Sequence, residues 1–477
     1  MSDNLNRVAD VVAIGGGGAG LAAAITAASG GVSVIVIERM AGVGGSTTFA
    51  EGMFAAESSM QFRKNIILTK DDVFKRHMEA TNWRANPHLV RAFIDKSANT
   101  IEWLQDLGVE FIEPAALYPG GPRTWHTIKG YGAAMVKVLL KKAKENKVQI
   151  ITKTTAKKLI TEEGRVTGLI AEDRDGNTIR ASAKAVVITD GGFANNKEML
   201  EKYTNAGPDL LPMGNEGKMG EGIQMAWEAG AAAEGTDVLQ LITPVVRTEK
   251  GLTHLAATLT QPYLWINKMG KRFCDEGIFQ FPFVGNAQAN QKDQIMFHIF
   301  DENTKNYMKE HGIDCGMGMY VPTTTKLEEI DADLKRGNGD GEVFMANSIE
   351  ELAANIHVDG KVLVATIDEY NKFCDQGHDD LFAKDPKYLQ PVRTPRFYAV
   401  RGFPSFTGTL GGIKINHRTE VLNKDFEVIP GLYAAGNCAG GMYGDSYDSA
   451  SAGTALGFAI NSGRMAGESA LAYISGK

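Results

Sequence analysis

A glycine-rich turn near the amino terminus constrains the fold more than any other stretch of this sequence. The six residues GGGGAG (15–20) stand between an apolar run, ADVVAIG (9–15), and an alanine-rich run, LAAAITAAS (21–29). A second apolar run, VSVIVIE (32–38), follows, so the pattern predicts strand, helix and strand of a parallel sheet. Gly15, Gly17 and Gly20 fit the spacing GxGxxG, which permits a tight turn, close approach of backbone amides to a diphosphate, and close packing of helix on strand. Glu38 ends the second strand, where an acidic side chain holds ribose hydroxyls, so the unit predicts a dinucleotide site.

The rest of the chain predicts an α/β protein in which both chain ends build one domain. Residues 132–147 predict an amphipathic helix, and strands alternate with turns over 148–189, which is typical of an antiparallel β-meander returning to the sheet. From about residue 239 to 401 the pattern is irregular, with helices predicted at 348–358 and 361–377. The chain closes with a strand, a loop and a long helix over 421–477. We therefore predict a nucleotide-binding domain of residues 1–238 and 407–477, with an inserted α+β cap domain, residues 239–406, for the substrate.

The composition argues against several classes of function. The 477 residues carry a formal net charge of −7 and no dense tract of Lys and Arg, so we expect no nucleic-acid partner. No apolar run is long enough to cross a bilayer and no export signal is visible, so we expect no membrane span. The 4 cysteines form no CxxC pair and the 9 histidines show no metal-ligand spacing. We therefore expect reduced thiols, a cytoplasmic location and no metal site.

The stretch after Glu38 points to the identity of the dinucleotide. ERMAGVGGSTTFAEGMF (38–54) resembles the flavoprotein subunits of the fumarate reductase and succinate dehydrogenase family, in which a GG-[SN]-[ST] run wraps the FAD diphosphate and the edge of the flavin ring. The resemblance recurs in family order at AVVITDGGFANN (185–196), VIPGLYAAGNCAGG (428–441) and SAGTALGFAINSGRMAGESA (451–470), so it covers most of the chain. It implies a Rossmann-like FAD-binding domain whose cofactor contacts are Gly15, Gly17, Gly18, Ala19, Gly20, Glu38, Arg39, Gly44, Gly45, Ser46, Thr47, Thr48, Gly52, Ala156, Thr189, Asp190, Gly191, Gly436, Asn437, Ser451, Gly453, Thr454, Ala455 and Leu456.

Three positions depart from the family pattern. Asp190 interrupts the family's ATGG run, and Asn437 stands where the family has an acid after AAG. The histidine that anchors flavin covalently in succinate dehydrogenases has no counterpart in GGSTTFAEG (44–52). The resemblance therefore implies FAD that is bound non-covalently.

The cations that carboxylate-reducing relatives use are missing. By the resemblance, a proton-donating arginine is expected near Gln280, and a carboxylate-binding arginine in the last loop, where Tyr447 or Ala450 stands. A histidine is expected before the double glycine at 411–412, where the sequence has Thr407 and Gly408. A dicarboxylate substrate is therefore disfavoured.

Aromatic and hydroxyl side chains stand in place of these cations. The sequence in this respect, and in GTLGG (408–412), resembles the ketosteroid dehydrogenases of the same superfamily more than the true fumarate reductases. In those enzymes tyrosines polarise a ring ketone and transfer a proton, while flavin N5 exchanges a hydride. The resemblance implies an FAD-dependent ene-reductase or dehydrogenase of a cyclic or aromatic enone, or of another carbon–carbon bond beside a carbonyl or aromatic ring. The candidate acid/base residues are Tyr447, Tyr443 and Tyr118, and the candidate substrate contacts are Phe279, Gln280, Phe281, Phe403, Phe406 and Thr409.

The long glycine-rich stretch GGMYGDSYDSASAGTALGF (440–458) fits this scheme. We expect the helix that begins in it to direct its free amides at the flavin, where the positive end of the helix dipole stabilises negative charge. The residues just before that helix, YGDSYDS (443–449), would border the substrate.

Two other interpretations stay open. One is a reductase of a fumarate-, acrylate- or urocanate-like carboxylate, with Arg247, Arg401 or His254 as the anchor. The other is a flavin electron-transfer or sensor protein, although a large cap domain is of little use to an electron carrier. No second dinucleotide-binding pattern is present, so the electron partner is NAD(P)H bound transiently or a separate redox protein.

Overall fold

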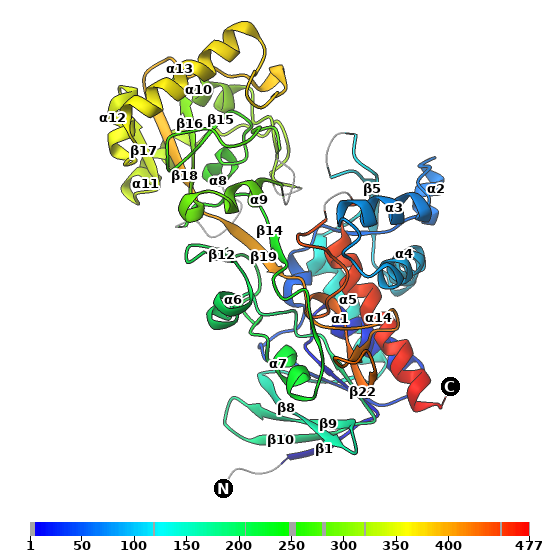
Figure 1. Ribbon diagram of the computed structural model, residues 1–477. Helices are drawn as coiled ribbons and strands as arrows, with labels where there is room; N and C mark the ends of the chain where they lie inside the picture. The colour runs from blue at the N-terminus through cyan, green and yellow to red at the C-terminus, as the bar shows by residue number, and fades with distance from the viewer. Residues whose placement is uncertain are drawn as a thin grey trace. The chain divides into compact units, whose positions relative to one another are not determined.

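The computed structural model describes residues 5–117, 120–205, 207–247, 254–278, 283–318, 321–448 and 451–476. The chain forms two compact units (Figure 1). Unit 1 comprises Met1–Asn205, Gly214–Gln240 and Gly408–Lys477, and unit 2 comprises Ala206–Met213 and Leu241–Thr407. The chain passes from unit 1 to unit 2 through β14 (Leu239–Leu241) and returns through β19 (Ser405–Thr409), which pairs with β12 (Leu211–Pro212).

A six-stranded sheet forms the centre of unit 1, in the order β21-β22-β11-β2-β3-β7. The strands are β2 (Val11–Ile14), β3 (Val34–Ile37), β7 (Gln149–Ile151), β11 (Ala185–Ile188), β21 (Glu420–Leu422) and β22 (Val428–Ala434). All neighbours are parallel except β21, which runs antiparallel to β22. The residues of β2, β3 and β11 are buried throughout, as expected of parallel strands covered on both faces. The predicted α/β fold is confirmed.

Helices from the two ends of the chain pack against each other on this sheet. α1 (Gly18–Ser29) contacts α14 (Thr454–Ile474) and α5 (Tyr131–Glu145), as Figure 1 shows. Glycines of α14 make the approach possible, because a Cβ added to Gly463 would lie 2.3 Å from the Ala19 carbonyl oxygen. A Cβ on Gly467, one turn further, would lie 2.6 Å from the Ala23 carbonyl oxygen. Small residues on α1 and α14 therefore set the spacing of the two helices.

Two smaller sheets complete unit 1. The predicted meander is the antiparallel set β8 (Thr154–Glu162), β9 (Arg165–Asp173) and β10 (Thr178–Ser182), with β1 (Leu5–Val8) parallel to β10 at its edge. A second set has β4 (Gly52–Phe54), β6 (Trp125–Ile128) and β5 (Phe111–Ala115) in antiparallel pairs. The remaining elements of unit 1 are η1 (Gly45–Phe49), α2 (Ser59–Arg63), α3 (Lys70–Ala80), α4 (Pro87–Leu107), α6 (Lys197–Tyr203), α7 (Glu221–Glu228), β13 (Ala233–Glu234), β20 (Gly412–Ile413) and η4 (Gly436–Cys438).

Unit 2 is an α+β unit around an antiparallel sheet. The strand order is β15-β16-β18-β17, made of β15 (Leu264–Asn267), β16 (Met296–Asp301), β18 (Phe397–Gly402) and β17 (Val343–Ala346). Its helical segments are α8 (His254–Thr258), α9 (Phe283–Ala289), η2 (Lys292–Gln294), α10 (Glu302–Glu310), α11 (Ile330–Gly339), α12 (Ile349–Asn355), α13 (Gly360–Gln376) and η3 (Pro386–Tyr388). The helices predicted at 348–358 and 361–377 correspond to α12 and α13.

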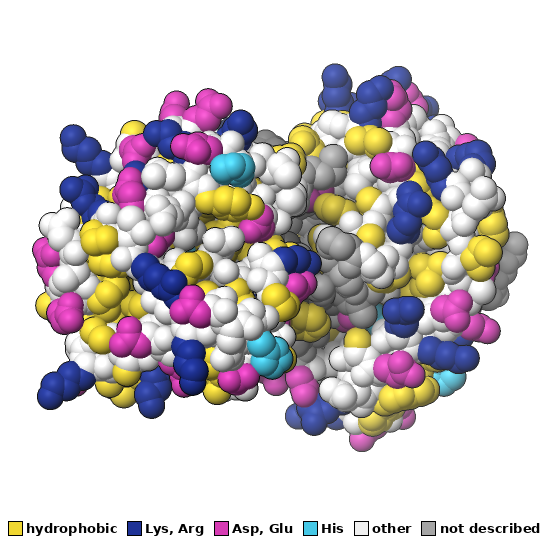
Figure 2. Space-filling view, turned by 90° about the horizontal axis from the view of Figure 1, so that it is seen from above, with side chains coloured by type: hydrophobic (Ala, Val, Ile, Leu, Met, Phe, Trp, Pro, Cys, Tyr) yellow, Lys and Arg dark blue, Asp and Glu magenta, His cyan; other side chains and the backbone are white. Residues whose placement is uncertain are grey.

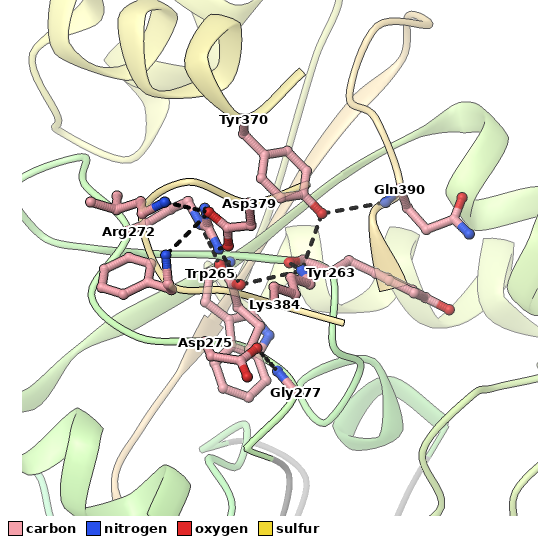
Figure 3. Close-up of polar contacts among 12 residues, drawn as sticks. Tyr263, Trp265, Arg272, Asp275, Gly277, Tyr370, Asp379, Lys384 and Gln390 are labelled. Atoms are coloured by element: carbon pink, nitrogen blue, oxygen red, sulfur yellow. Dashed lines mark hydrogen bonds and ion pairs between the residues drawn. The ribbon is translucent and has the colours of Figure 1, made fainter. Parts of the chain in front are cut away.

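A buried ionic network lies inside unit 2 (Figure 3). The guanidinium of Arg272 donates to Glu276 at 2.8 and 2.7 Å and to Asp379 at 3.1 and 2.7 Å. The Lys384 ammonium lies 3.2 Å from Glu276 and also contacts the Tyr370 hydroxyl at 3.1 Å. These charged side chains are fully or almost fully buried, so each depends on the others for its solvation.

The outer surface mixes the two signs of charge. Figure 2 shows Lys and Arg side chains interspersed with Asp and Glu on the face that it draws. In the parts of the chain that the structure describes, no helix combines the length and the apolar character needed to cross a bilayer.

Candidate cofactor and active site

The turn between β2 and α1 has the shape that a diphosphate requires. Gly15 has a φ of +102°, and a Cβ placed there would lie 2.5 Å from the Thr189 carbonyl oxygen. A Cβ on Gly20 would lie 1.9 Å from the Gly15 carbonyl oxygen, so this glycine permits the contact of helix and turn. Gly17, at the cap of α1, has open space around its Cα. The turn therefore offers an open helix N-terminus to an anion, and the residues fit a dinucleotide cofactor.

Next to the turn, a pocket extends between the carboxyl ends of the parallel strands and the start of α7. Glu38 lies in it with one carboxylate oxygen accepting the Gly16 N–H at 2.6 Å and the other accepting the Met40 N–H at 2.7 Å. Burial raises the pKa of Glu38, although these two hydrogen bonds oppose the shift. The pocket is lined by Ile14, Gly15, Ile37, Glu38, Arg39, Thr154, Thr155, Ala156, Asp190, Gly217, Glu221 and Gly222. Five of the sequence-predicted cofactor residues (Gly15, Glu38, Arg39, Ala156 and Asp190) thus meet in one pocket.

Asp190, one of the departures from the family pattern, is a buried acid at this pocket. Its Oδ2 accepts the Gly222 N–H at 2.7 Å, and so ties the end of β11 to the start of α7. Burial raises the pKa of Asp190 to about 6, and the neighbouring Glu221 adds to that rise. Glu221 itself pairs with Arg39 at 2.6 Å.

The predicted GG-S-T segment folds as η1 beside the start of α1. The Thr47 hydroxyl accepts the Gly18 N–H at 3.2 Å, and Gly44 precedes η1 with a φ of +118°. Gly45, Ser46 and Thr48 belong to the same turn of 3₁₀ helix. Gly52 differs from the others, because it lies in β4, where a Cβ would meet Trp125 and His126 of β6 at 2.7 Å. The structure thus gives Gly52 a packing role between strands.

The last loop and the start of α14 carry the remaining cofactor positions. Gly436 and Asn437 lie in η4, and a Cβ on Gly436 would lie 3.1 Å from the Ala19 side chain at the start of α1. Gly453 has a φ of +86° and precedes α14, which begins at Thr454. The Ser451 hydroxyl is buried and has no hydrogen-bond partner among the described residues. An unused buried hydroxyl at a helix start is consistent with a ligand there.

The two candidate tyrosines of the last loop lie together. Their ring centroids are 5.3 Å apart, and both side chains are largely buried. Burial raises the pKa of Tyr443 and of Tyr447, and for Tyr447 hydrogen bonds with Thr454 and the Ala455 backbone oppose the rise. The Thr454 hydroxyl lies 3.1 Å from the Tyr447 hydroxyl, at the first residue of α14. Because a raised pKa keeps a phenol protonated, neither side chain is suited to act as a base near neutral pH, and each carries a hydroxyl hydrogen that it can donate.

A buried histidine–aspartate pair, which the sequence did not predict, fixes this loop. His77 of α3 has its Nδ1 2.9 Å from Asp448 Oδ2, and both side chains are almost inaccessible. The other ring nitrogen of His77 lies 2.8 Å from the Met442 carbonyl oxygen, so it carries a hydrogen and donates. The loop residues on either side of Tyr443 and Tyr447 are thus held by one side chain from α3. The two partners are far apart in the sequence, and no local pattern connects them.

A buried lysine of the same unit was also missed. Lys218 lies in the turn before α7 and is only 4% exposed. Its carbonyl oxygen accepts the Asn195 N–H at 2.9 Å, which fixes the turn to the segment after β11. The sequence offered no signal for it, because a lysine beside glycines in a polar stretch is usually on the surface.

The candidate substrate residues are only partly described. Tyr118, Phe279, Gln280, Phe281 and Ala450 lie outside the described residues. The Thr409 hydroxyl accepts the Phe193 N–H at 3.0 Å and is fully buried, which is a structural contact within unit 1.

The described phenylalanines, Phe403 and Phe406, are buried in unit 2. Arg247 and Arg401, considered as carboxylate anchors, both lie over the Phe403 ring, at 4.3 and 4.5 Å from its centroid. Arg247 also pairs with Asp209, so its charge already has a partner. His254 stands at the first position of α8. Among the described residues, no group of His, Cys, Asp and Glu side chains could hold a metal ion.

Comparison with known proteins identifies one family, and it finds relatives whose sequences match nearly the whole chain. The sequence profile of the FAD binding domain family matches residues 10–454. The vinyl phenol reductase of Lactiplantibacillus plantarum is 36% identical over 481 residues, which cover 97% of this chain and 96% of that protein. A fumarate reductase (cytochrome) of Shewanella frigidimarina is 28% identical over 469 residues, 97% of this chain and 77% of its own length. Among solved structures, a 3-ketosteroid-Δ4-(5α)-dehydrogenase from Rhodococcus jostii RHA1 matches with a TM-score of 0.76 and 26% identity, covering 99% of this chain and 100% of that one.

Proposed function

Because the chain belongs to the FAD binding domain family, we propose that it is an FAD-dependent reductase that adds hydrogen across the vinyl double bond of a hydroxylated aromatic compound. The cofactor FAD, and oxidoreductase chemistry on a carbon–carbon bond, follow from the family and its relatives. The observation that carries the substrate class is the 36% identity with a vinyl phenol reductase over nearly the full length of both chains. The absence of arginine and histidine from residues 440–458 supports it, because a neutral aromatic substrate needs no carboxylate anchor there.

The chemistry of such a substrate defines what the protein must supply. Reduction of 4-vinylphenol adds a proton to the terminal carbon and a hydride to the carbon next to the ring. If the phenol oxygen loses its proton as the terminal carbon gains one, the ring becomes a conjugated quinone methide, and its benzylic carbon then accepts the hydride. The oxygen finally regains a proton, so the net change is one proton and one hydride. When bound and reduced, FAD supplies the hydride.

We assign the proton to the tyrosine pair of the last loop. Tyr447 is kept protonated by burial, and its hydroxyl lies at the start of α14 beside the Thr454 hydroxyl, at 3.1 Å. After the proton leaves, the Thr454 hydroxyl and the helix N-terminus stabilise the oxygen that remains. Tyr443 packs against Tyr447, and the His77–Asp448 pair holds the backbone of both. FAD is held without a covalent bond, by the residues of the turn, the pocket and η1.

The test uses the purified protein with its flavin, kept anaerobic and reduced chemically. We expect 4-vinylphenol to restore the absorbance of oxidised flavin rapidly and to yield 4-ethylphenol by chromatography. Styrene, which lacks the hydroxyl, is the matched control and should react far more slowly. Reoxidation by fumarate or urocanate, with 4-vinylphenol inert, would instead establish the carboxylate interpretation. Reoxidation by 2-cyclohexenone alone would move the substrate class to cyclic enones, the chemistry suggested by the ketosteroid dehydrogenase likeness.

A further inference from the structure

One histidine of α3 contacts both ends of the tyrosine loop, residues 442–448, which carries the two candidate tyrosines. The Nε2 atom of His77 lies 2.8 Å from the Met442 carbonyl oxygen, directly before the first tyrosine. Its Nδ1 atom lies 2.9 Å from Asp448 Oδ2, directly after the second tyrosine, and both of these side chains are buried. A single imidazole therefore bridges the two ends of the loop.

This geometry requires two protons at the histidine–aspartate pair. A carbonyl oxygen only accepts, so Nε2 of His77 carries a hydrogen and donates it to Met442. Nδ1 faces a carboxyl oxygen at 2.9 Å, where two lone pairs would repel, so a second proton lies on Nδ1 or on the Asp448 carboxyl group. Each partner compensates the buried polarity of the other, and removing either one leaves the other uncompensated.

The Asp448 end of the loop leads directly to the proposed proton donor. The Thr454 hydroxyl lies 3.5 Å from the Asp448 carbonyl oxygen and 3.1 Å from the Tyr447 hydroxyl. A continuous series of contacts thus runs from the α3 imidazole through Asp448 and Thr454 to the Tyr447 phenol. A shift of the Asp448 side chain would therefore move the groups that fix the phenol.

A second ion pair joins the same two segments at the surface. Arg84, in the turn after α3, pairs with Asp445 of the tyrosine loop, and their side chains are 64% and 65% exposed. Water competes for both partners, so a pair of this kind contributes little. The exposed pair is therefore a matched comparison for the buried one.

We propose that His77 is a positioning residue, which acts through Asp448 to hold the Tyr447 hydroxyl where the proton is delivered. The contact with Asp448 carries this effect more than the contact with Met442, because Asp448 is the neighbour of Tyr447 and faces the same threonine hydroxyl. The inference rests on the proposed function, in which Tyr447 donates the proton.

The experiment keeps the two contacts of the imidazole one at a time. In H77N the side-chain amide reaches about as far as Nδ1 and keeps a donor for Asp448. In H77Q the amide reaches about as far as Nε2 and keeps a donor for the Met442 carbonyl oxygen. R84Q, which removes the exposed ion pair, is the control. Each reduced holoenzyme is mixed anaerobically with 4-vinylphenol at several concentrations, and the rate of flavin reoxidation is followed.

In H77Q we expect the maximal rate to fall about 10- to 100-fold, the range for a misplaced reacting group. The concentration that gives half the maximal rate should stay close to the wild-type value, whereas a general loosening of the fold would change both quantities. H77N should react faster than H77Q, and R84Q should match the wild type. The double variant H77Q/D448A should be no slower than the slower of its single variants, because the two side chains act through one contact. Equal losses in H77N and H77Q, or additive losses in the double variant, would overturn the proposal.

A measurement without substrate makes the test independent of the substrate class. Backbone amide hydrogen exchange of the tyrosine loop is followed by mass spectrometry, and we expect it to be faster in H77Q than in the wild type and R84Q. Unchanged exchange, or faster exchange with an unchanged reaction rate, would show that His77 does not position Tyr447. If the wild type itself does not react with 4-vinylphenol, the proposed function is wrong, and the series is run with the acceptor that does reoxidise the flavin. Should H77Q fail to retain FAD, D448A is measured in its place.

Discussion

At the scale of single residues, the chemistry of this protein depends on side-chain contacts that form only when the chain is folded. Tyr447 meets Thr454 across a loop, His77 reaches Asp448 from another helix, and Lys218 reaches the segment of Gly408. Tyr447 was predictable from its place in a family motif, whereas no local pattern pointed to His77 or Lys218. Each of these two is unremarkable among its sequence neighbours and acquires a role only through tertiary contacts.

Replacing Tyr447 by Phe tests the proposed proton donor. Because Phe keeps the ring and removes the hydroxyl, we expect turnover of 4-vinylphenol to fall by about two to four orders of magnitude, the range for an acid/base group. The flavin spectrum should stay unchanged. Y433F is the matched control, since Tyr433 is a buried tyrosine of β22 in the same unit. Normal turnover in Y447F would remove this side chain from the mechanism.

Asp190 predicts a dependence of stability on pH. The pKa of its carboxyl is raised from 3.8 to about 6, so between these values the folded protein holds a proton that the unfolded chain releases. Stability from this group is therefore present below about pH 4 and is lost as the pH rises through 6, by up to about 3 kcal/mol. We expect D190N to lose less stability than the wild type between pH 4 and pH 6.5, measured as unfolding free energy of the holoenzyme. Parallel curves for the two proteins would show that Asp190 does not titrate in this range.

At the scale of elements, the glycines explain how much of the fold the sequence could predict. The turn at Gly15–Gly20 was predictable, because its strand, glycine spacing and helix are contiguous and each has a local physical reason. The packing role of Gly52 was not, since a glycine in a motif looks the same whether it faces a ligand or a neighbouring strand. The contact of α1 with α14 was also hidden, because it joins the two ends of the chain.

Replacing Gly463 by Ala tests the contact between α1 and α14. The added methyl group would lie 2.3 Å from the Ala19 carbonyl oxygen, so the helices must separate. We expect a loss of about 1 to 3 kcal/mol of stability, together with weaker FAD binding, because Ala19 belongs to the cofactor turn. Thermal unfolding and flavin release by dilution measure the two effects.

The control is G360A in α13 of unit 2. There the nearest atom to the added methyl group, apart from its neighbours in the helix, is the Ala353 Cβ at 4.0 Å, so neither effect is expected. Equal FAD affinity in G463A and the wild type would mean that the two helices adjust without moving the turn.

At the scale of the whole molecule, each of the two units is stabilised by its own set of interactions. Unit 1 has an apolar core of sheet and helices, with α1 and α14 at its centre. Unit 2 has apolar clusters on both faces of its sheet and, between α13 and the segment after β15, the ionic network of Arg272. The irregular sequence pattern predicted an inserted region. It could not predict the ionic network, because the members of the network lie as far apart as positions 272 and 384.

Removing Asp379 tests the network of unit 2. In D379A the Arg272 guanidinium keeps Glu276 but loses two hydrogen bonds, and its buried charge is less well compensated. We expect a loss of about 3 to 5 kcal/mol, seen as a lower unfolding temperature. D375A is the control, because Asp375 forms an exposed pair with Arg393 and should contribute less than about 1 kcal/mol. Similar effects of the two substitutions would show that Arg272 finds compensation elsewhere.

The contact between α1 and α14 also sets an order of events during synthesis. The nascent chain presents the cofactor turn before the main stretch of unit 2, yet α14, which packs on that turn, is synthesised only after unit 2. Unit 2, apart from its short segment at 206–213, is encoded as one uninterrupted stretch and can fold while translation continues. The glycine turn therefore lacks its contact with α14 until unit 2 has been synthesised. A chain that stops before α14 would contain all of unit 2 but an incomplete cofactor site.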